Sequence, residues 1–170
     1  LATPDRVAID DRGVLVTYKE LDRRATNLAQ SFYDHGYSVG DRIATLSGNS
    51  ADQVVLFFAC AKAGLALVPI SWRLSSSEVA EQIQMVRPAL LVVEDEFSSL
   101  AKEAIEKLID PPTTAAFGVV GLESNMPNSL SANQTIREVT DSDDLLIVFT
   151  SGTVDKPKAP ILTHSNCFWT

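Results

Sequence analysis

Short apolar runs alternate with helix-initiation signals along this chain, and this alternation limits the folds that the sequence can adopt. The apolar runs have the length of β-strands, and the segments between them carry apolar residues at the spacing of one helix face. Strands are expected at 7–10, 14–17, 42–46, 65–70, 89–93, 117–120 and 143–149. Strands that alternate with helices are typical of a mostly parallel sheet covered on both faces. The predicted fold class is therefore α/β, with a mostly parallel sheet and helices on both faces.

The expected helix starts share one pattern, a Ser or Thr followed three positions later by Glu or Gln. In such a capping box each of the two side chains accepts a hydrogen bond from the other residue's backbone N–H. The three pairs are Thr17 with Glu20, Ser50 with Gln53, and Ser75 with Glu78. Gly36 and Gly64 are placed to end the first two helices, because glycine is favoured just after a helix. A fourth helix is expected at 97–109.

Composition sets the class of protein. The chain has 170 residues, 45% of them apolar, which is enough for one domain with a buried core. Its formal charge of −8 disfavours nucleic acid and anionic membranes as partners. No apolar run is long enough to span a bilayer, and the two cysteines suggest no disulfide framework, so a reducing cytoplasm is the expected location. The chain starts without Met, and we expect it to be part of a longer protein.

The last predicted strand, 143–149, runs directly into a segment rich in hydroxyls and lysines, Thr150-Ser151-Gly152-Thr153-Val154-Asp155-Lys156-Pro157-Lys158. Ligands of open α/β sheets bind just beyond the carboxyl ends of strands. Backbone N–H groups of a Gly-containing turn, hydroxyls and ammonium groups all suit phosphate oxygens. The residues therefore indicate a phosphate-binding loop, with a plain solvated turn as the alternative. The chain has neither a Walker loop nor a dinucleotide-binding Gly-x-Gly-x-x-Gly.

A family resemblance makes this segment more specific. Phe-Thr-Ser-Gly-Thr-x-x-Lys-Pro-Lys at 149–158, followed by Leu-Thr-His-x-Asn at 162–166, resembles the phosphate-loop signature of the adenylate-forming superfamily. That superfamily includes acyl-CoA synthetases, adenylation domains of peptide synthetases and luciferases. Weaker similarities upstream, such as Thr17-Tyr18-x-Glu20-Leu21 and Val39-Gly40-Asp41-Arg42, extend the resemblance over nearly the whole chain. It matches about the first third of such an enzyme, so residues 1–170 resemble the N-terminal portion of an AMP-binding domain.

The resemblance implies a function and a set of site residues. It implies that Thr150, Ser151, Gly152, Thr153 and Lys158 bind the β- and γ-phosphates of ATP, with Mg²⁺ bridging the phosphates. A carboxylic acid, with a fatty acid as the expected class, would become an acyl-adenylate and then a thioester with coenzyme A. The family's catalytic motifs have no counterpart here, so no catalytic residue is assigned and the 170 residues alone are expected to be inactive. Metal ligands and oligomeric state are not assigned.

Four residues depart from the family pattern within and just after this signature, namely Val154, Asp155, Ala159 and Pro160. Val154 removes a hydroxyl, and Asp155 places a carboxylate near a polyphosphate. At about 6 Å and an effective dielectric of about 20–80, one such charge pair repels by roughly 0.7–3 kcal/mol. These departures leave open a non-catalytic relative with a degenerate phosphate loop. Another phosphotransfer enzyme and a flavodoxin-like interaction module are two further alternatives.

Two residues outside the phosphate loop have expected structural roles. His164 is expected to have a local capping or packing role, and Cys60 to lie in the core.

Overall fold

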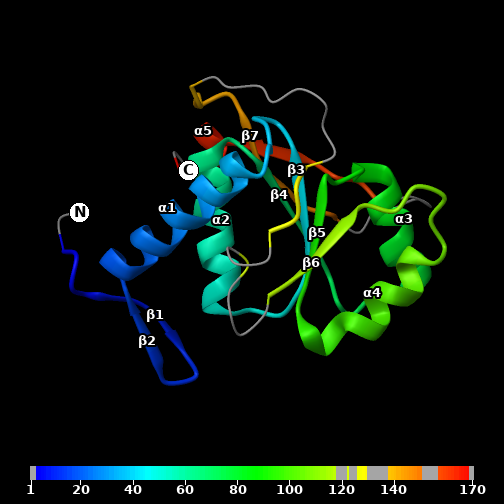
Figure 1. Cartoon of the computed structure of the whole chain (residues 1–170), viewed down its shortest axis with the longest axis horizontal. Helices are drawn as coiled ribbons and strands as arrows, with labels where there is room; N and C mark the ends of the chain where they lie inside the picture. Colours follow the sequence, from blue (N-terminus) through cyan, green and yellow to red (C-terminus); the bar gives the residue numbers. More distant parts are fainter. Residues whose placement is uncertain (1–2, 118–121, 123–125, 130–137, 151–156, 169–170) are drawn as a thin grey trace.

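A six-stranded sheet forms the centre of the computed structural model, which describes residues 3–117, 122, 126–129, 138–150 and 157–168. The strand order is β6-β5-β3-β4-β7-β8 (Figure 1). The strands are β3 Arg42–Leu46, β4 Ala66–Ile70, β5 Leu90–Val93, β6 Thr113–Ala116, β7 Asp144–Ile147 and β8 Ile161–Thr163. Neighbouring strands are parallel, except that β8 runs antiparallel to β7. The predicted mostly parallel α/β sheet is confirmed.

Helices cover both faces of this sheet. They are α1 Tyr18–Asp34, α2 Ala51–Ala63, α3 Ser76–Val86, α4 Ser98–Ile105 and the short α5 His164–Phe168. Alternate residues of one strand serve opposite faces, because side chains alternate along a strand. In β3, Ile43 packs in the cluster that contains the buried residues of α1 and α2, whereas Ala44 packs in the cluster of α3 and α4. Figure 1 shows the same two helical layers, one on each side of the sheet.

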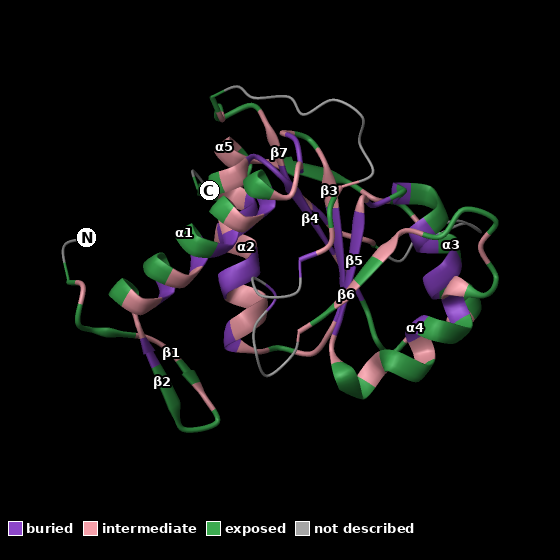
Figure 2. Ribbon diagram, in the orientation of Figure 1, coloured by how far each residue is buried: buried purple, intermediate pink, exposed green. Residues whose placement is uncertain are grey.

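The interior strands are buried on both faces, which explains their continuous apolar sequences. All four residues of β5 are buried, and Leu90, Leu91 and Val92 are fully so (Figure 2). Full burial of one such side chain contributes about 1.5–3 kcal/mol. Cys60 also lies in this core, and burial raises the pKa of its thiol. The prediction of a core position for Cys60 is confirmed.

The Ser and Thr residues predicted to start the helices all do so. The side chains of Thr17, Ser50 and Ser75 each accept a hydrogen bond from the backbone N–H three residues later. The reciprocal bond of a capping box is found at α3, where Glu78 accepts from the Ser75 N–H at 2.8 Å.

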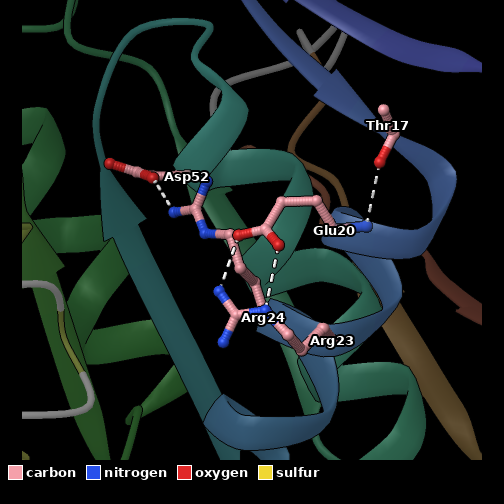
Figure 3. Close-up of polar contacts among 5 residues, drawn as sticks. All are labelled: Thr17, Glu20, Arg23, Arg24 and Asp52. Atoms are coloured by element: carbon pink, nitrogen blue, oxygen red, sulfur yellow. Dashed lines mark hydrogen bonds and ion pairs between the residues drawn. The ribbon is translucent and has the colours of Figure 1, made fainter. Parts of the chain in front are cut away.

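At α1 and α2 the side chain of the third helical residue bonds elsewhere. The predicted capping boxes are therefore correct for the Thr17 and Ser50 caps and wrong for the reciprocal bonds. Glu20 pairs with Arg23 through bonds of 2.6 and 2.9 Å (Figure 3). Gln53 turns inward, where its amide donates to the Thr45 hydroxyl at 3.1 Å and accepts from Ser47 at 3.0 Å. An ion pair at Glu20 and buried polar contacts at Gln53 thus take the place of the reciprocal bond to the cap backbone.

The first two strands form a separate hairpin, β1 Val7–Asp11 and β2 Val14–Thr17, beside α1 (Figure 1). Polar contacts tie this region to α2. The Asp11 carboxylate accepts from the backbone N–H of Ala51 at 2.8 Å. Arg24 of α1 pairs with Asp52 of α2 (Figure 3), and Lys62 pairs with Asp22 at 2.9 Å. The ion pairs join α1 to both ends of α2.

Two strands differ from expectation. Strand β6, Thr113–Ala116, was not predicted, because an edge strand with one exposed side needs no apolar run. Phe117 follows that strand, and residues 118–120 lie outside the described residues. Strand β8 was not predicted, since three residues give too short a pattern to recognise. Among the described residues, no helix combines the length and apolar character that crossing a membrane requires.

Candidate functional site

The predicted phosphate-binding segment begins where strand β7 ends. Leu145 and Ile147 of β7 are buried in the sheet between β4 and β8. Thr150 follows three residues after Ile147, beyond the carboxyl end of the strand, and its side chain is exposed. This edge of a parallel sheet is where α/β proteins bind ligands. The structure therefore places the start of the signature at the position expected from the sequence.

The two described ends of the signature lie against each other. The Thr150 N–H donates to the carbonyl of Lys158 at 2.9 Å, and the two residues form an isolated antiparallel bridge. Two residues further out, the Val148 N–H donates to the carbonyl of Pro160 at 3.2 Å. The bridge continues the antiparallel pairing of β7 and β8. Thr150 and Lys158 thus extend the β7–β8 hairpin at the point where the described part of the signature stops on each side.

The structure describes two of the five predicted phosphate-binding residues. Thr150 and Lys158 have adjacent backbones, and both are exposed. Ser151, Gly152 and Thr153 lie outside the described residues, as do Val154, Asp155 and Lys156. Their proposed roles stay predictions.

The second half of the signature, Leu-Thr-His-x-Asn, has a structural role as a helix start. The Thr163 hydroxyl accepts from the Asn166 backbone N–H at 3.3 Å. The side-chain oxygen Oδ1 of Asn166 accepts from the Thr163 N–H at 3.1 Å and from the Thr163 hydroxyl at 3.0 Å. This reciprocal cap opens α5 directly after β8. Its sequence signal, a Thr followed three residues later by a polar amide, is visible in advance.

His164 is the first residue of α5. This position is compatible with the local capping or packing role that the sequence predicts. Its backbone N–H donates to the Asp143 carbonyl at 3.0 Å, and its ring lies 6.3 Å from that of Phe168. The Asp143 carboxylate in turn accepts from the Thr140 N–H at 2.7 Å. Acidic residues at this strand entry therefore serve turn and helix contacts. Among the described residues, no group of three or more His, Cys, Asp or Glu side chains is placed to hold a metal directly.

A cavity of about 720 Å³ opens beside Thr150, beyond the carboxyl ends of β3, β4 and β7. One wall is α3, with Glu78, Glu81 and Gln82, and another is the turn after β4, with Trp72 and Arg73. The volume is in the range of small-molecule sites. The position of Gln82 was missed from sequence, although a glutamine on the otherwise apolar buried face of α3 is the available signal.

The turn after β4 is held by stacked side chains. The Trp72 ring stacks on Phe97 with ring centres 5.4 Å apart and planes 14° apart. The Arg73 guanidinium carbon lies 4.2 Å from the centre of the Trp72 ring, a cation–π contact. Trp72 is therefore held between Phe97 and Arg73 while it remains partly exposed, and Arg73 presents a positive charge at the cavity.

Glu78 is held ionised at the start of α3. The hydrogen bond from the Ser75 hydroxyl, followed by the bond from the Ser75 backbone, lowers the pKa of Glu78 below its ordinary value. Both donors favour the charged carboxylate. The cavity wall on α3 therefore carries negative charge, whereas the turn after β4 carries the positive charge of Arg73.

Comparison with known proteins decides the family. The family model described as AMP-binding enzyme matches residues 1–170. This chain belongs to the AMP-binding enzyme family. The sequence-based recognition of the adenylate-forming superfamily is confirmed.

Relatives and solved structures agree with this family. The chain is 32% identical over 167 residues to a fatty acid–acyl-carrier-protein ligase, ScoC, from Streptomyces coeruleorubidus, covering 97% of the chain and 31% of the relative. It is 29% identical over 168 residues to a feruloyl-CoA synthase from an Amycolatopsis species, covering 98% and 32%. The structure of a luciferase-like enzyme from the mealworm Zophobas morio superposes with a TM-score of 0.80 at 23% identity, covering 94% of this chain and 39% of that one, which shows the shared fold. The chain spans about a third of the length of these curated relatives.

Proposed function

We propose that residues 1–170 are the N-terminal part of an AMP-binding domain, in an enzyme that uses ATP to activate a carboxylic acid. The observation that carries this proposal is the Thr150–Lys158 bridge, which joins the two described ends of the signature at the carboxyl edge of a parallel sheet. Backbone N–H groups, hydroxyls and a lysine at such an edge are suited to a polyphosphate. Membership of the AMP-binding family supports the same ligand.

Each signature residue has a proposed role toward ATP. The hydroxyls of Thr150, Ser151 and Thr153 and the backbone at Gly152 hold the β- and γ-phosphates. Lys158, at the base of the loop, neutralises charge on the same phosphates. Neutralising the pyrophosphate as it leaves is the kind of electrostatic effect that accelerates such a transfer. Mg²⁺ bound with ATP supplies further positive charge.

The proposed reaction has two steps. The substrate carboxylate attacks the α-phosphorus of ATP, the bond to the pyrophosphate breaks, and acyl-adenylate forms. A thiol then attacks the acyl carbon, AMP leaves, and the thiol proton is released. A fatty acid is the proposed substrate and coenzyme A the proposed thiol, as the fatty acid ligase and the CoA synthase among the relatives suggest. We propose that the enzyme works in the cytoplasm.

Pyrophosphate exchange into ATP tests the proposal in the complete protein that contains these residues. A matched pair of variants separates the proposed ligand from a nearby charge: Lys158→Ala removes the signature lysine, and Lys156→Ala removes a lysine at a position where the family pattern tolerates any residue. Lys158→Ala is expected to lower exchange by about 10²–10³-fold, and Lys156→Ala to leave it nearly unchanged. Equal activity of Lys158→Ala and the natural protein would show that the loop is wrongly assigned.

A second candidate is a relative that binds nucleotide without turnover. It is favoured by the four departures from the family pattern, Val154, Asp155, Ala159 and Pro160. A complete protein that binds ATP but catalyses no exchange with any carboxylic acid would establish it. The isolated 170-residue chain is expected to catalyse no exchange in either case.

A further inference from the structure

Strand β6 forms one edge of the sheet in the described part of the chain. Its inner neighbour is β5, with which it pairs in parallel. The Phe117 N–H, directly after β6, donates to the Val93 carbonyl at 3.0 Å. Because successive N–H groups of a strand point to opposite sides, those of Thr114 and Ala116 point away from β5. The edge therefore presents two backbone N–H groups, and the carbonyls of the same two residues, to a further strand.

The composition of β6 leaves this edge accessible. Natural proteins usually protect an edge strand with charged side chains, with a bulge or with a covering segment. β6 reads Thr-Thr-Ala-Ala, Thr114 and Ala116 are exposed, and the pairing with β5 has a regular register. Figure 2 shows this exposure beside the buried strand β5. Pro111 and Pro112 precede the strand and have no N–H, so further pairing would be confined to β6 itself.

An apolar groove of about 420 Å³ runs along the same edge, between β6 and α4. It reaches Ser98 at the start of α4 and Ala116 at the end of β6. Its apolar lining consists of Val93, Ala101, Ile105, Ala115 and Ala116. At the opposite end of the edge, between α4 and β6, the side chain of Ile109 is 97% exposed. One edge thus carries an apolar groove at one end and a protruding apolar side chain at the other.

A two-fold axis through Ala115, perpendicular to the sheet, brings these features together in pairs. Antiparallel pairing about this axis sets Thr114 opposite Ala116 of a second copy, and such a pair can exchange two N–H···O bonds. The rotation also reverses the direction of the edge, so Ile109 of each copy moves toward the groove of the other. Every contact then occurs twice, as in the self-complementary interface of a two-fold dimer.

The charges on α4 are complementary under the same rotation. Lys102 and Glu106 are four residues apart, and both line the groove. Neither forms an ion pair with another described residue. Because the rotation reverses the helix, Lys102 of each copy approaches Glu106 of the other. An arrangement with both helices in the same direction would instead place like charges side by side, so the charges select the antiparallel one.

We propose that two copies of the complete protein associate through the β6 edge and α4, about a two-fold axis near Ala115. The two sheets then become one continuous sheet, and Ile109 of each copy fills the groove of the other. A second copy is the occupant that fits, because the backbone donors and acceptors, the groove and the opposite charges match a reversed copy of the same edge. The proposal is independent of the proposed function.

Sedimentation velocity of the complete protein over a concentration series tests the proposal. The natural protein should pass from monomer to dimer as its concentration rises. Ile109→Asp places a charge in the groove of the second copy, and Ala116→Pro removes an outward N–H at a position where an edge strand tolerates proline. Each variant should raise the dissociation constant of the dimer by about tenfold or more. The thermal midpoint of the dilute monomer should change little in Ile109→Asp, because the side chain is exposed.

A charge reversal tests the orientation of the two copies. Lys102→Glu sets like charges together and should weaken the dimer by about tenfold. Adding Glu106→Lys restores opposite charges and should recover the natural affinity, which a purely local effect on α4 would not do. Lys107→Glu makes the same change of charge at an exposed residue that does not line the groove, so it should leave the affinity nearly unchanged.

Three outcomes would overturn the proposal. The first is a natural protein that stays monomeric at every concentration. The second is a dimer with unchanged affinity in Ile109→Asp and Ala116→Pro, since another surface would then join the copies. The third comes from hydrogen exchange, in which the amides of Thr114 and Ala116 should gain protection as the protein concentration rises. Protection that is independent of concentration would show that another segment of the same chain covers the edge.

Discussion

The carboxylate of Asp11 accepts a hydrogen bond from the backbone N–H of Ala51 at 2.8 Å, so the β1–β2 hairpin supplies an anion to the start of helix α2. The first N–H groups of a helix lack partners within the helix, and the helix dipole favours negative charge there. Forty residues of sequence separate the two groups. The contact therefore ties the hairpin to the α/β layer as well as capping the helix.

Removal of this contact should destabilise the protein. Asp11→Ala is expected to lower the free energy of unfolding by about 1 kcal/mol, because a helix N–H loses its partner and the charge is lost. Asp5→Ala, an exposed carboxylate earlier in the chain, is the control and should have little effect. Urea denaturation of both variants measures the difference, and equal midpoints would show that the contact contributes nothing.

The capping box of α3 should make stability depend on pH. The pKa of Glu78 is lowered in the folded protein by its bonds to Ser75. A lowered folded-state pKa means that the stabilisation is present above the ordinary value of 4.5 and disappears as the pH falls through the folded-state value. Glu78→Gln should thus unfold at a lower temperature at pH 7 and match the natural protein near pH 3. A deficit that persisted at pH 3 would contradict the assignment.

Two glycines with similar backbones should respond differently to alanine. Gly64 has φ 71, and a Cβ there would lie 2.9 Å from a Val39 methyl and 3.0 Å from a Val139 methyl. Gly40 has φ 93 and open space around its added Cβ. Gly40→Ala should cost about 1–2 kcal/mol from backbone strain, and Gly64→Ala about 1–3 kcal/mol more from crowding. Equal losses in thermal unfolding would mean that the valines move aside without cost.

The carboxylate of Asp155 should weaken binding of ATP. Asp155 replaces a glycine of the family pattern inside the signature, and its charge would repel a phosphate that the signature binds. Asp155→Asn in the complete protein should tighten ATP binding by about 3- to 160-fold, from roughly 0.7–3 kcal/mol of relieved repulsion. The gain should shrink in high salt, which screens charge. Unchanged affinity at low salt would indicate that the carboxylate points away from the nucleotide.

The helix starts illustrate how far local sequence can predict structure. Thr17, Ser50 and Ser75 all cap helices, because the bond from a cap to the N–H three residues later needs nothing beyond the local chain. The reciprocal bond depends on which other partners are near. Gln53 faces Thr45 and Ser47 only after β3 and α2 have packed, and no local pattern contains that information.

The candidate site was also predictable from the sequence only in part. The residue types from Thr150 to Lys158 indicate phosphate chemistry and the family, because their hydroxyls, glycine and lysines follow a buried strand. The pairing of Thr150 with Lys158 could not be predicted, because it depends on β8, whose three residues acquire strand geometry by pairing with β7. The cavity beside Thr150 could not be predicted from the sequence either, because its walls come from segments that are far apart in the chain.

The sequence by itself determined the α/β class, the helix starts and the family, since hydrophobic period, capping residues and a contiguous signature are all local properties. Tertiary structure alone decided the strand order, the antiparallel return of β8 and the cavity that is lined by both α3 and Thr150. The physical reason is that these features depend on which distant surfaces pack together.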